Sequence, residues 1–159
     1  MFLKPDYNLK SIYDINLEEL KQKGITAILF DLDSTLMASK TARYDDKTLD
    51  WLANVKKDFF IAVISNNHDQ QYIEKVKNVT DFPIVFKACK PDIKIAKSFM
   101  DEHNLKGKTT AFVGDRPLTD TLCGQRLRCT TILVDSISAD REKPIVRFVR
   151  KLERLTVKK

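Results

Sequence analysis

Two aspartates, Asp31 and Asp33, stand two residues apart where the short apolar run Ile28-Leu29-Phe30 ends. In a strand, side chains at positions i and i+2 point to the same side. If the chain leaves the strand at Asp31, both carboxylates can converge at the carboxyl end of a sheet, where open α/β sheets place their ligands. Close carboxylates repel each other unless a cation lies nearby or one of them is protonated. The pair therefore indicates a divalent metal, an acid/base pair, or both.

The same D-x-D pattern also suits a turn that caps the following helix. Further polar clusters follow other strand-like runs, in the order Ser65-Asn66-Asn67, Lys90-Pro91, Gly114-Asp115 and Asp120. Each cluster alone could supply a helix cap or a surface charge. Their joint occurrence, each just after an apolar run, favours a site over isolated turns.

The order Asp-x-Asp-x-Thr, Ser, Lys and Gly-Asp-x-x-x-x-Asp resembles the four-motif signature of the haloacid dehalogenase-like (HAD) phosphohydrolases. The resemblance extends over nearly the whole chain to the YqeG-type branch, subclass IIIA, which is similar to phosphatidylglycerophosphate phosphatases. The segments Phe2-Leu3-Lys4-Pro5-Asp6 and Ala88-Cys89-Lys90-Pro91 also carry it. Departures occur at Ser34, at Arg116-Pro117 and at Cys123-Gly124-Gln125. None of these removes a catalytic group, but they leave the substrate open.

This resemblance implies a Mg²⁺-dependent phosphomonoester hydrolase that works through an aspartyl-phosphate. Asp31 is the implied nucleophile, and Asp33 the acid that protonates the leaving alcohol and then activates water. Lys90 would offset the charge of Asp31 and of the phosphoryl group. The implied metal site combines Asp31, Asp115 and the backbone carbonyl of Asp33. Asp120 would orient a metal-bound water or the lysine.

Further residues are implied to bind the phosphate: Ser34, Thr35, Ser65, Asn66, Lys90 and Arg116. We expect Ser65 at the start of a helix, where backbone donors favour an anion. Arg116, beside the metal aspartate, could hold a second phosphate or a carboxylate. Gly114 would permit a close backbone approach near the metal.

Strand-like and helix-like segments alternate along the chain. The sequence predicts strands over residues 25–30, 59–64, 82–86, 110–113 and 130–134. Helices are predicted over residues 17–23, 46–56, 69–78, 91–103, 117–126 and 143–157. This alternation predicts an α/β fold, a Rossmann-like three-layer α/β/α sandwich with a mainly parallel sheet of about five strands. The spacings from Asp33 to Ser65 and on to Lys90 leave no room for an inserted cap domain. We expect one capless domain over residues 1–159.

The composition is that of an ordinary globular protein, with 43% hydrophobic and 31% charged residues and a net charge of +6. No apolar run approaches the roughly 20 residues needed to span a bilayer. The N-terminus lacks the pattern of a secretory signal. Cys89, Cys123 and Cys129 suggest buried or semi-buried thiols in a reducing compartment rather than disulfides or a zinc site. We therefore expect a cytoplasmic protein.

The C-terminal stretch concentrates basic residues: Arg141, Lys143, Arg147, Arg150, Lys151, Arg154, Lys158 and Lys159, against only Glu142 and Glu153. Apolar residues fall on one helical face and most of the basic ones opposite. We expect the apolar face to pack on the sheet and the basic face to lie in solvent, where it is either only solvated or attracted weakly to an anionic membrane surface. A basic stripe that binds membrane would place part of the protein at the inner face of the membrane.

Several functions remain open at this point. The lead is a phosphatase with a large substrate, such as a phosphorylated lipid. The alternatives are a polynucleotide-end phosphatase, a small-metabolite phosphatase, or a non-catalytic phosphate-binding module. Nucleic acid is disfavoured because the basic tail has a single aromatic residue, Phe148, for stacking on bases. The oligomeric state is not predicted.

Overall fold

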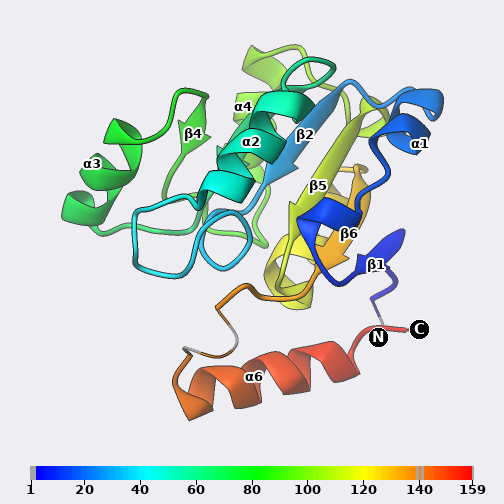
Figure 1. The fold of residues 1–159 in the computed structure, drawn as a ribbon. Helices are drawn as coiled ribbons and strands as arrows, with labels where there is room; N and C mark the ends of the chain where they lie inside the picture. Colours follow the sequence, from blue (N-terminus) through cyan, green and yellow to red (C-terminus); the bar gives the residue numbers. More distant parts are fainter. Residues whose placement is uncertain (1–2, 139, 141, 159) are drawn as a thin grey trace.

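The computed structural model describes residues 3–138, 140 and 142–158, so Phe2, Arg141 and Lys159 lie outside the described residues. Its strands form one parallel sheet in the order β1-β6-β5-β2-β3-β4 (Figure 1). In chain order the strands are β1 (Tyr7–Leu9), β2 (Ala27–Phe30), β3 (Phe60–Ile64), β4 (Ile84–Val85), β5 (Thr110–Gly114) and β6 (Thr130–Val134). The predicted parallel α/β architecture is confirmed.

Strand β2 lies inside the sheet and is buried along its whole length, as its uninterrupted apolar sequence predicts. Phe30 pairs in register with Val63 of β3 and with Val113 of β5. These three strands therefore end close to the same level. The residues that follow them, around Asp31, Ser65 and Asp115, leave one edge of the sheet together.

Helices cover both faces of the sheet. They are α1 (Leu17–Gln22), α2 (Asp46–Val55), α3 (Gln70–Asn78), α4 (Lys94–Glu102) and α5 (Leu122–Arg126), whereas α6 (Pro144–Leu155) lies at one end of the sheet. Side chains of α1, α2 and α3 share one apolar core with the sheet, and those of α4 and α5 share a second core. Because successive strand residues point to opposite faces, Ile28 and Phe30 enter the first core while Leu29 enters the second. This is the three-layer arrangement expected from the sequence.

The sheet has six strands rather than the expected five or so. The additional strand, β1, is three residues long and pairs with β6 at the edge. Asp6 holds it there, because its carboxylate accepts hydrogen bonds from the Thr131 backbone N–H and hydroxyl at 2.8 and 3.1 Å. So short a segment has too few residues for an alternating pattern to stand out.

Two helices begin differently from the prediction. Helix α4 starts at Lys94 rather than at Pro91, because the Asp92 side chain accepts a 2.7 Å bond from the Lys94 N–H and forms a turn first. Before α5, Pro117–Thr121 forms a wide π-helical turn. The Arg116 carbonyl accepts bonds from both Asp120 and Thr121 there. Cys89, expected to be at least partly buried, is exposed.

Helix α6 has the opposite orientation to the predicted one. Its large apolar side chains are exposed, while its acidic residue Glu153 is buried and Arg150 and Arg154 face the body of the protein. Polar partners at the carboxyl end of the sheet outcompete apolar packing, because both cores are already closed by α1 to α5. Figure 1 shows α6 at the end of the sheet toward which the strands point, apart from the flanking helices.

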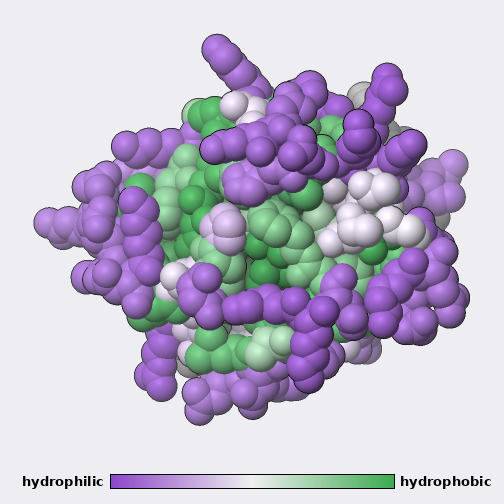
Figure 2. All heavy atoms as spheres, turned by 90° about the horizontal axis from the view of Figure 1, so that it is seen from above, coloured by the Kyte–Doolittle hydropathy of each residue, from purple (hydrophilic) through white to green (hydrophobic). Residues whose placement is uncertain are grey.

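The opposite end of the molecule, where the strands begin, is viewed in Figure 2. Hydrophobic atoms show through in the middle of that face, within a rim of hydrophilic side chains. None of the helices described is long and apolar enough to cross a membrane. Residues 31–90, all described, contain only loops, α2, β3, α3 and β4, with no inserted cap domain.

Candidate active site

A pocket of about 720 Å³ opens at the carboxyl end of the sheet. The residues singled out from the sequence that line it are Asp31, Asp33, Ser34, Ser65, Asn66, Lys90, Arg116 and Asp120. Thr35 and Asp115 lie buried beside it. The sequence therefore identified residues from four separate loops that meet in space.

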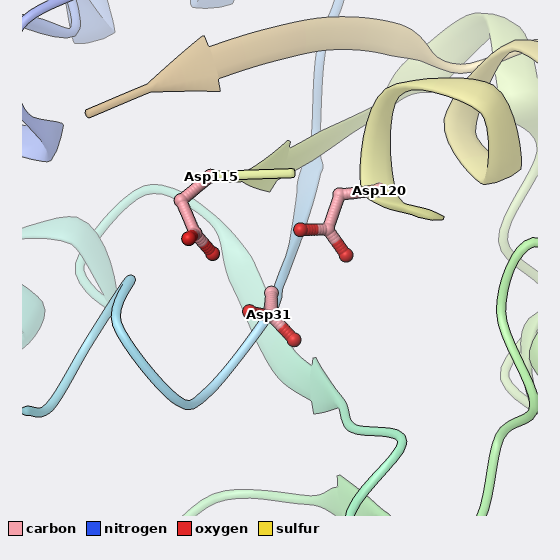
Figure 3. A group of neighbouring side chains, drawn as sticks. All are labelled: Asp31, Asp115 and Asp120. Atoms are coloured by element: carbon pink, nitrogen blue, oxygen red, sulfur yellow. The ribbon is translucent and has the colours of Figure 1, made fainter. Parts of the chain in front are cut away.

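Three carboxylates form a cluster at this edge. Asp31 follows β2, Asp115 follows β5, and Asp120 comes from the π-helical turn, as Figure 3 shows. One oxygen of each lies within 4.8 Å of the others. Asp115 and Asp120 are buried, whereas Asp31 is partly exposed to the pocket. Asp31 is thus the carboxylate most accessible to a substrate.

Lys90 is buried between two of these aspartates. Its Nζ lies 2.8 Å from Asp31 Oδ1 and 2.7 Å from Asp120 Oδ1. Burial alone would lower the pKa of Lys90, but the charges of Asp120 and Asp31 outweigh it and raise that pKa. Burial, followed by repulsion from Asp31, raises the pKa of Asp120 to about 6 against the attraction of Lys90. The lysine remains a cation and holds both carboxylates.

Asp33 lies in a different environment from Asp31. The Tyr72 hydroxyl donates to Asp33 Oδ1 at 2.5 Å, and the Asn67 amide and the Lys40 backbone N–H approach its two oxygens at 3.4 Å. Burial and the charge of Asp31 raise the pKa of Asp33, while these donors oppose the rise. Asp33 is therefore biased toward the protonated form, which a general acid requires.

The loop after β2 holds the cluster through Thr35. Its hydroxyl lies 3.0 Å from Asp115 Oδ1 and 3.4 Å from Asp31 Oδ2, so it connects the two carboxylates. Ser34 has a positive φ of 69° and directs its hydroxyl toward Glu142, at 3.5 Å, rather than toward Asp31. Asparagine tolerates that backbone region better than serine does.

The segment after β3 does not begin a helix at Ser65, contrary to the expectation above. Helix α3 starts at Gln70 and is capped by Asp69, so Ser65 lies in a loop. Its buried oxygen accepts a 3.1 Å bond from the Asn67 N–H, which leaves the Ser65 hydroxyl proton available to the pocket. Asn66 exchanges two bonds with the backbone of Lys90, at 2.7 and 3.0 Å. Asn66 therefore positions the lysine.

Two residues of helix α6, Glu153 and Arg150, form ion pairs that the sequence did not predict. Arg116 forms a two-point ion pair with Glu153, at 2.5 and 3.3 Å, so its guanidinium is already engaged. Arg150 forms ion pairs with both Asp115 and Glu142. Burial lowers the pKa of Arg150, against the attraction of nearby acids. An arginine expected in solvent therefore lies beside the acidic cluster.

Gly114 is required by Asp120 rather than by a metal. A Cβ at this position would lie 2.3 Å from the Asp120 side chain. Any larger residue would displace the carboxylate that pairs with Lys90. The close approach expected from the sequence exists, but its partner is a side chain.

The cluster fits a Mg²⁺ ion. Its donors are carboxylate oxygens, which this cation prefers to nitrogen or sulfur. When ionised, Asp31, Asp115, Asp120 and Glu142 exceed the two cations that pair with them, Lys90 and Arg150, by two charges. A divalent cation would offset that excess. Asp31, Asp115 and Asp120 are the residues placed to hold it, whereas the carboxylate of Asp33 faces Tyr72.

Sequence reasoning missed Tyr72, Asn67, Lys40 and Arg150 among the pocket residues. Tyr72 falls at an apolar position of α3 and was indistinguishable from a core residue. Asn67 belongs to the Ser65-Asn66-Asn67 cluster that the sequence did single out, so its signal was present. Lys40 contributes a backbone N–H, which no side-chain pattern reveals.

The sequence is similar to those of known phosphatases. A family model described as mitochondrial PGP phosphatase matches residues 1–138. "Probable phosphatase YqeG" of Bacillus subtilis (strain 168) is 30% identical over 153 residues, which cover 96% of this chain and 88% of that protein. "Phosphatidylglycerophosphate phosphatase 1, chloroplastic/mitochondrial" of Arabidopsis thaliana is 28% identical, covering 99% of this chain. The chain spans 48% of that plant relative.

Solved structures with low sequence identity share the fold. A HAD-like family hydrolase from Porphyromonas gingivalis superposes with a TM-score of 0.58 at 15% identity, covering 81% of this chain and 98% of its own. A HAD family enzyme from Bacteroides thetaiotaomicron, solved as a magnesium complex, gives a TM-score of 0.54 at 15% identity, with coverages of 72% and 95%. At such identities the likeness concerns the fold alone.

Proposed function

Because the chain belongs to the mitochondrial PGP phosphatase family, we propose that it hydrolyses the phosphomonoester of phosphatidylglycerophosphate or of a closely related phosphorylated lipid. The chain is a HAD-like phosphatase of the YqeG type, and a phosphorylated substrate follows from that. We further propose that residues 1–159 act as one domain. The observation that carries the proposal is the contrast between Asp31, paired with a buried lysine, and Asp33, biased toward its protonated form.

In the first step, an oxygen of Asp31 attacks the phosphorus and the bond to the alcohol oxygen breaks. Asp33 gives its proton to that departing oxygen, which produces the free alcohol and an aspartyl-phosphate on Asp31. Lys90 lies close enough to Asp31 to offset the charge that gathers on the phosphoryl oxygens. The Ser65 hydroxyl donates a hydrogen bond to one of those oxygens.

In the second step, Asp33, now ionised, takes a proton from a water molecule that attacks the phosphorus and releases phosphate from Asp31. Asp33 is protonated again at the end of the cycle. Asp31, Asp115 and Asp120 would hold Mg²⁺, which would supply positive charge near the phosphoryl oxygens. Thr35 holds two of these carboxylates relative to each other.

A phosphorylated lipid headgroup is favoured as substrate by the plant relative's name and by the pocket itself. The pocket opens to solvent, and the exposed Lys40 and Lys75 line it. Phosphatidylglycerophosphate carries a phosphodiester next to the phosphomonoester, and these two cations would attract that second negative charge. The proposed location is the cytoplasm, with peripheral association at the inner face of the membrane.

The proposal is tested by phosphate release from a substrate panel in Mg²⁺. The panel compares phosphatidylglycerophosphate in mixed micelles, a 5′-phosphorylated oligonucleotide, and small phosphomonoesters including p-nitrophenyl phosphate. We expect the lipid to give the highest kcat/KM and Asp31→Asn to abolish release from every substrate. Turnover by Asp31→Asn would contradict the nucleophile assignment. A higher kcat/KM on the oligonucleotide or a metabolite would replace the lipid as substrate.

A further inference from the structure

The outward face of α6 concentrates exposed apolar side chains. Large hydrophobic side chains that are exposed number eleven among the described residues, and six of them lie on α6. We define the α6 apolar face as Ile145, Phe148, Val149, Leu152 and Leu155. Phe148 is 57% exposed, Leu152 47% and Leu155 68%. Single exposed apolar residues are normal, but a continuous set on one helix marks an interaction surface.

Helix α6 is fixed to the body through its other side, so its apolar face is directed outward. Glu153 pairs with Arg116, and Arg154 donates to the Val134 carbonyl at 2.6 Å. At the end of the helix, the Leu3 N–H donates to the Thr156 carbonyl at 2.7 Å. These contacts leave the apolar face with no partner among the described residues.

The charges that border this face are all of one sign. From residue 143 to 158, the exposed charged side chains are Lys143, Arg147, Lys151 and Lys158. The acid of this stretch, Glu153, is buried against Arg116. A helix with an apolar face and only cations exposed beside it is typical of helices that lie in the plane of an anionic bilayer, with the apolar side chains among the acyl chains. A second copy of the chain docked on the same face would instead bring the cations of both copies together, and they would repel each other.

We propose that the α6 apolar face docks on an anionic lipid bilayer, with Arg147 and Lys151 at the level of the headgroups. This differs from attraction by a basic stripe, because the apolar side chains make the main contact and the cations assist. Salt should therefore weaken the association without abolishing it.

The position of α6 beside the pocket links membrane docking to the proposed reaction. Val146 and Arg150, on the same helix, line the pocket. When the apolar face lies on a bilayer, the pocket mouth lies at the membrane surface, where a phosphorylated headgroup projects. The benefit of docking for catalysis rests on the proposed lipid substrate. The docking itself can be measured without turnover.

The test is co-sedimentation of the full chain with vesicles of equal parts phosphatidylglycerol and phosphatidylcholine, compared with pure phosphatidylcholine. Phe148→Gln with Leu152→Gln should lower the bound-to-free ratio roughly tenfold or more, because two of the five inserted side chains become polar. The matched control is Leu49→Gln with Ile95→Gln, which changes exposed apolar residues of α2 and α4 and should bind as the wild type does. Arg147→Glu with Lys151→Glu should weaken binding at low salt and matter less at high salt.

Tryptophan fluorescence quenching measures directly whether α6 contacts the acyl chains. Phe148→Trp should be quenched by brominated acyl chains in anionic vesicles, whereas the native Trp51, packed against Tyr13 and Phe30, should not. Equal binding by the α6 double variant and the wild type, or no quenching, would overturn the proposal. A wild-type dimer in light scattering that becomes monomeric only in that variant, without vesicle binding, would assign the face to a second copy and also overturn it.

The same variants separate this inference from the proposed function. The α6 double variant should keep wild-type kcat/KM on p-nitrophenyl phosphate and lose rate only on vesicle-borne phosphatidylglycerophosphate. Vesicle binding without lipid hydrolysis would refute the substrate and leave the docking intact. Lipid hydrolysis in micelles without vesicle binding would refute the docking and leave the proposed substrate intact.

Discussion

At the residue scale, the most instructive pair is Asp31 and Asp33. Their spacing alone predicted that they converge, but not that they would differ. Lys90 pairs with Asp31, whereas Tyr72 and Asn67 donate to Asp33. Two identical side chains two residues apart can thereby serve as nucleophile and as acid, because Lys90 lies against Asp31 while burial raises the pKa of Asp33.

Changing Asp33→Asn should slow hydrolysis and make the covalent intermediate accumulate. With p-nitrophenyl phosphate, whose leaving group needs no proton, Asp31 should still be phosphorylated. Release should fall by about 10² to 10⁴, because the general base for water is absent. Acid quenching and mass spectrometry should detect phosphate on the peptide that carries Asp31. A variant with slow turnover and no trapped phosphate would contradict the two-step route.

Tyr72→Phe should move the alkaline limb of the pH–rate profile to higher pH. The Tyr72 hydroxyl favours the ionised form of Asp33 and lowers its pKa, so its removal should raise that pKa further. Asp33 would then keep its proton to higher pH. The shift should appear in kcat/KM for an alkyl phosphate and be absent for p-nitrophenyl phosphate. An unchanged or acid-shifted limb for the alkyl phosphate would show that Asp33 is not the group that titrates.

At the element scale, the sequence predicted which segments are helices and strands far better than how α6 is oriented. Its apolar periodicity is that of a core-facing helix, and a helix with that pattern ordinarily buries it. The pattern cannot reveal that α1 to α5 already cover both faces of the sheet, nor that Glu153 and Arg150 find partners at the site. The edge strand β1 was missed for a related reason: its pairing depends on Asp6 and Thr131, far apart in sequence.

The Arg116–Glu153 pair should couple α6 to the site. Arg116→Ala and Glu153→Ala are each expected to destabilise the protein, Glu153→Ala less, since Arg116 is partly exposed and can be hydrated. The double variant should lose less than the two single losses combined, with a coupling free energy of about 0.5 to 1 kcal/mol. Urea unfolding of the four proteins measures it. Strictly additive losses would mean that the pair does not hold α6 in place.

At the scale of the whole molecule, the candidate site lies at one end of the sheet, the carboxyl end of its strands. The end where the strands begin contains none of the residues that line the pocket. At the carboxyl end, four loops and α6 surround the pocket and its acidic cluster. The sequence predicted that these residues gather at one end because polar residues follow buried strands, and β2, β3 and β5 end close to the same level. It could not reveal how much uncompensated negative charge collects there, since that depends on which cations come close.

That charge makes the stability of the protein depend jointly on pH and on metal. Burial and Asp31 raise the pKa of Asp120 to about 6, and burial also raises the pKa of Asp33. A carboxyl whose pKa is higher in the folded than in the unfolded state binds its proton more tightly when folded. The contribution of Asp120 to stability is therefore present below about pH 4 and lost as the pH rises through about 6.

Mg²⁺ should replace that lost contribution, because it binds the deprotonated carboxylates. At a concentration of about 100 times its Kd, it should add roughly 2.7 kcal/mol to the free energy of unfolding. For a chain of this length that raises the melting temperature by roughly 5 to 10 °C. The rise should be large near pH 7.5 and small near pH 5, where protons compete with the metal. Thermal melts at both pH values, with Mg²⁺ or with a chelator, measure it, and Asp115→Asn should reduce the rise at the higher pH. An equal rise at both pH values, or none in the wild type, would mean that these carboxylates are not the metal ligands.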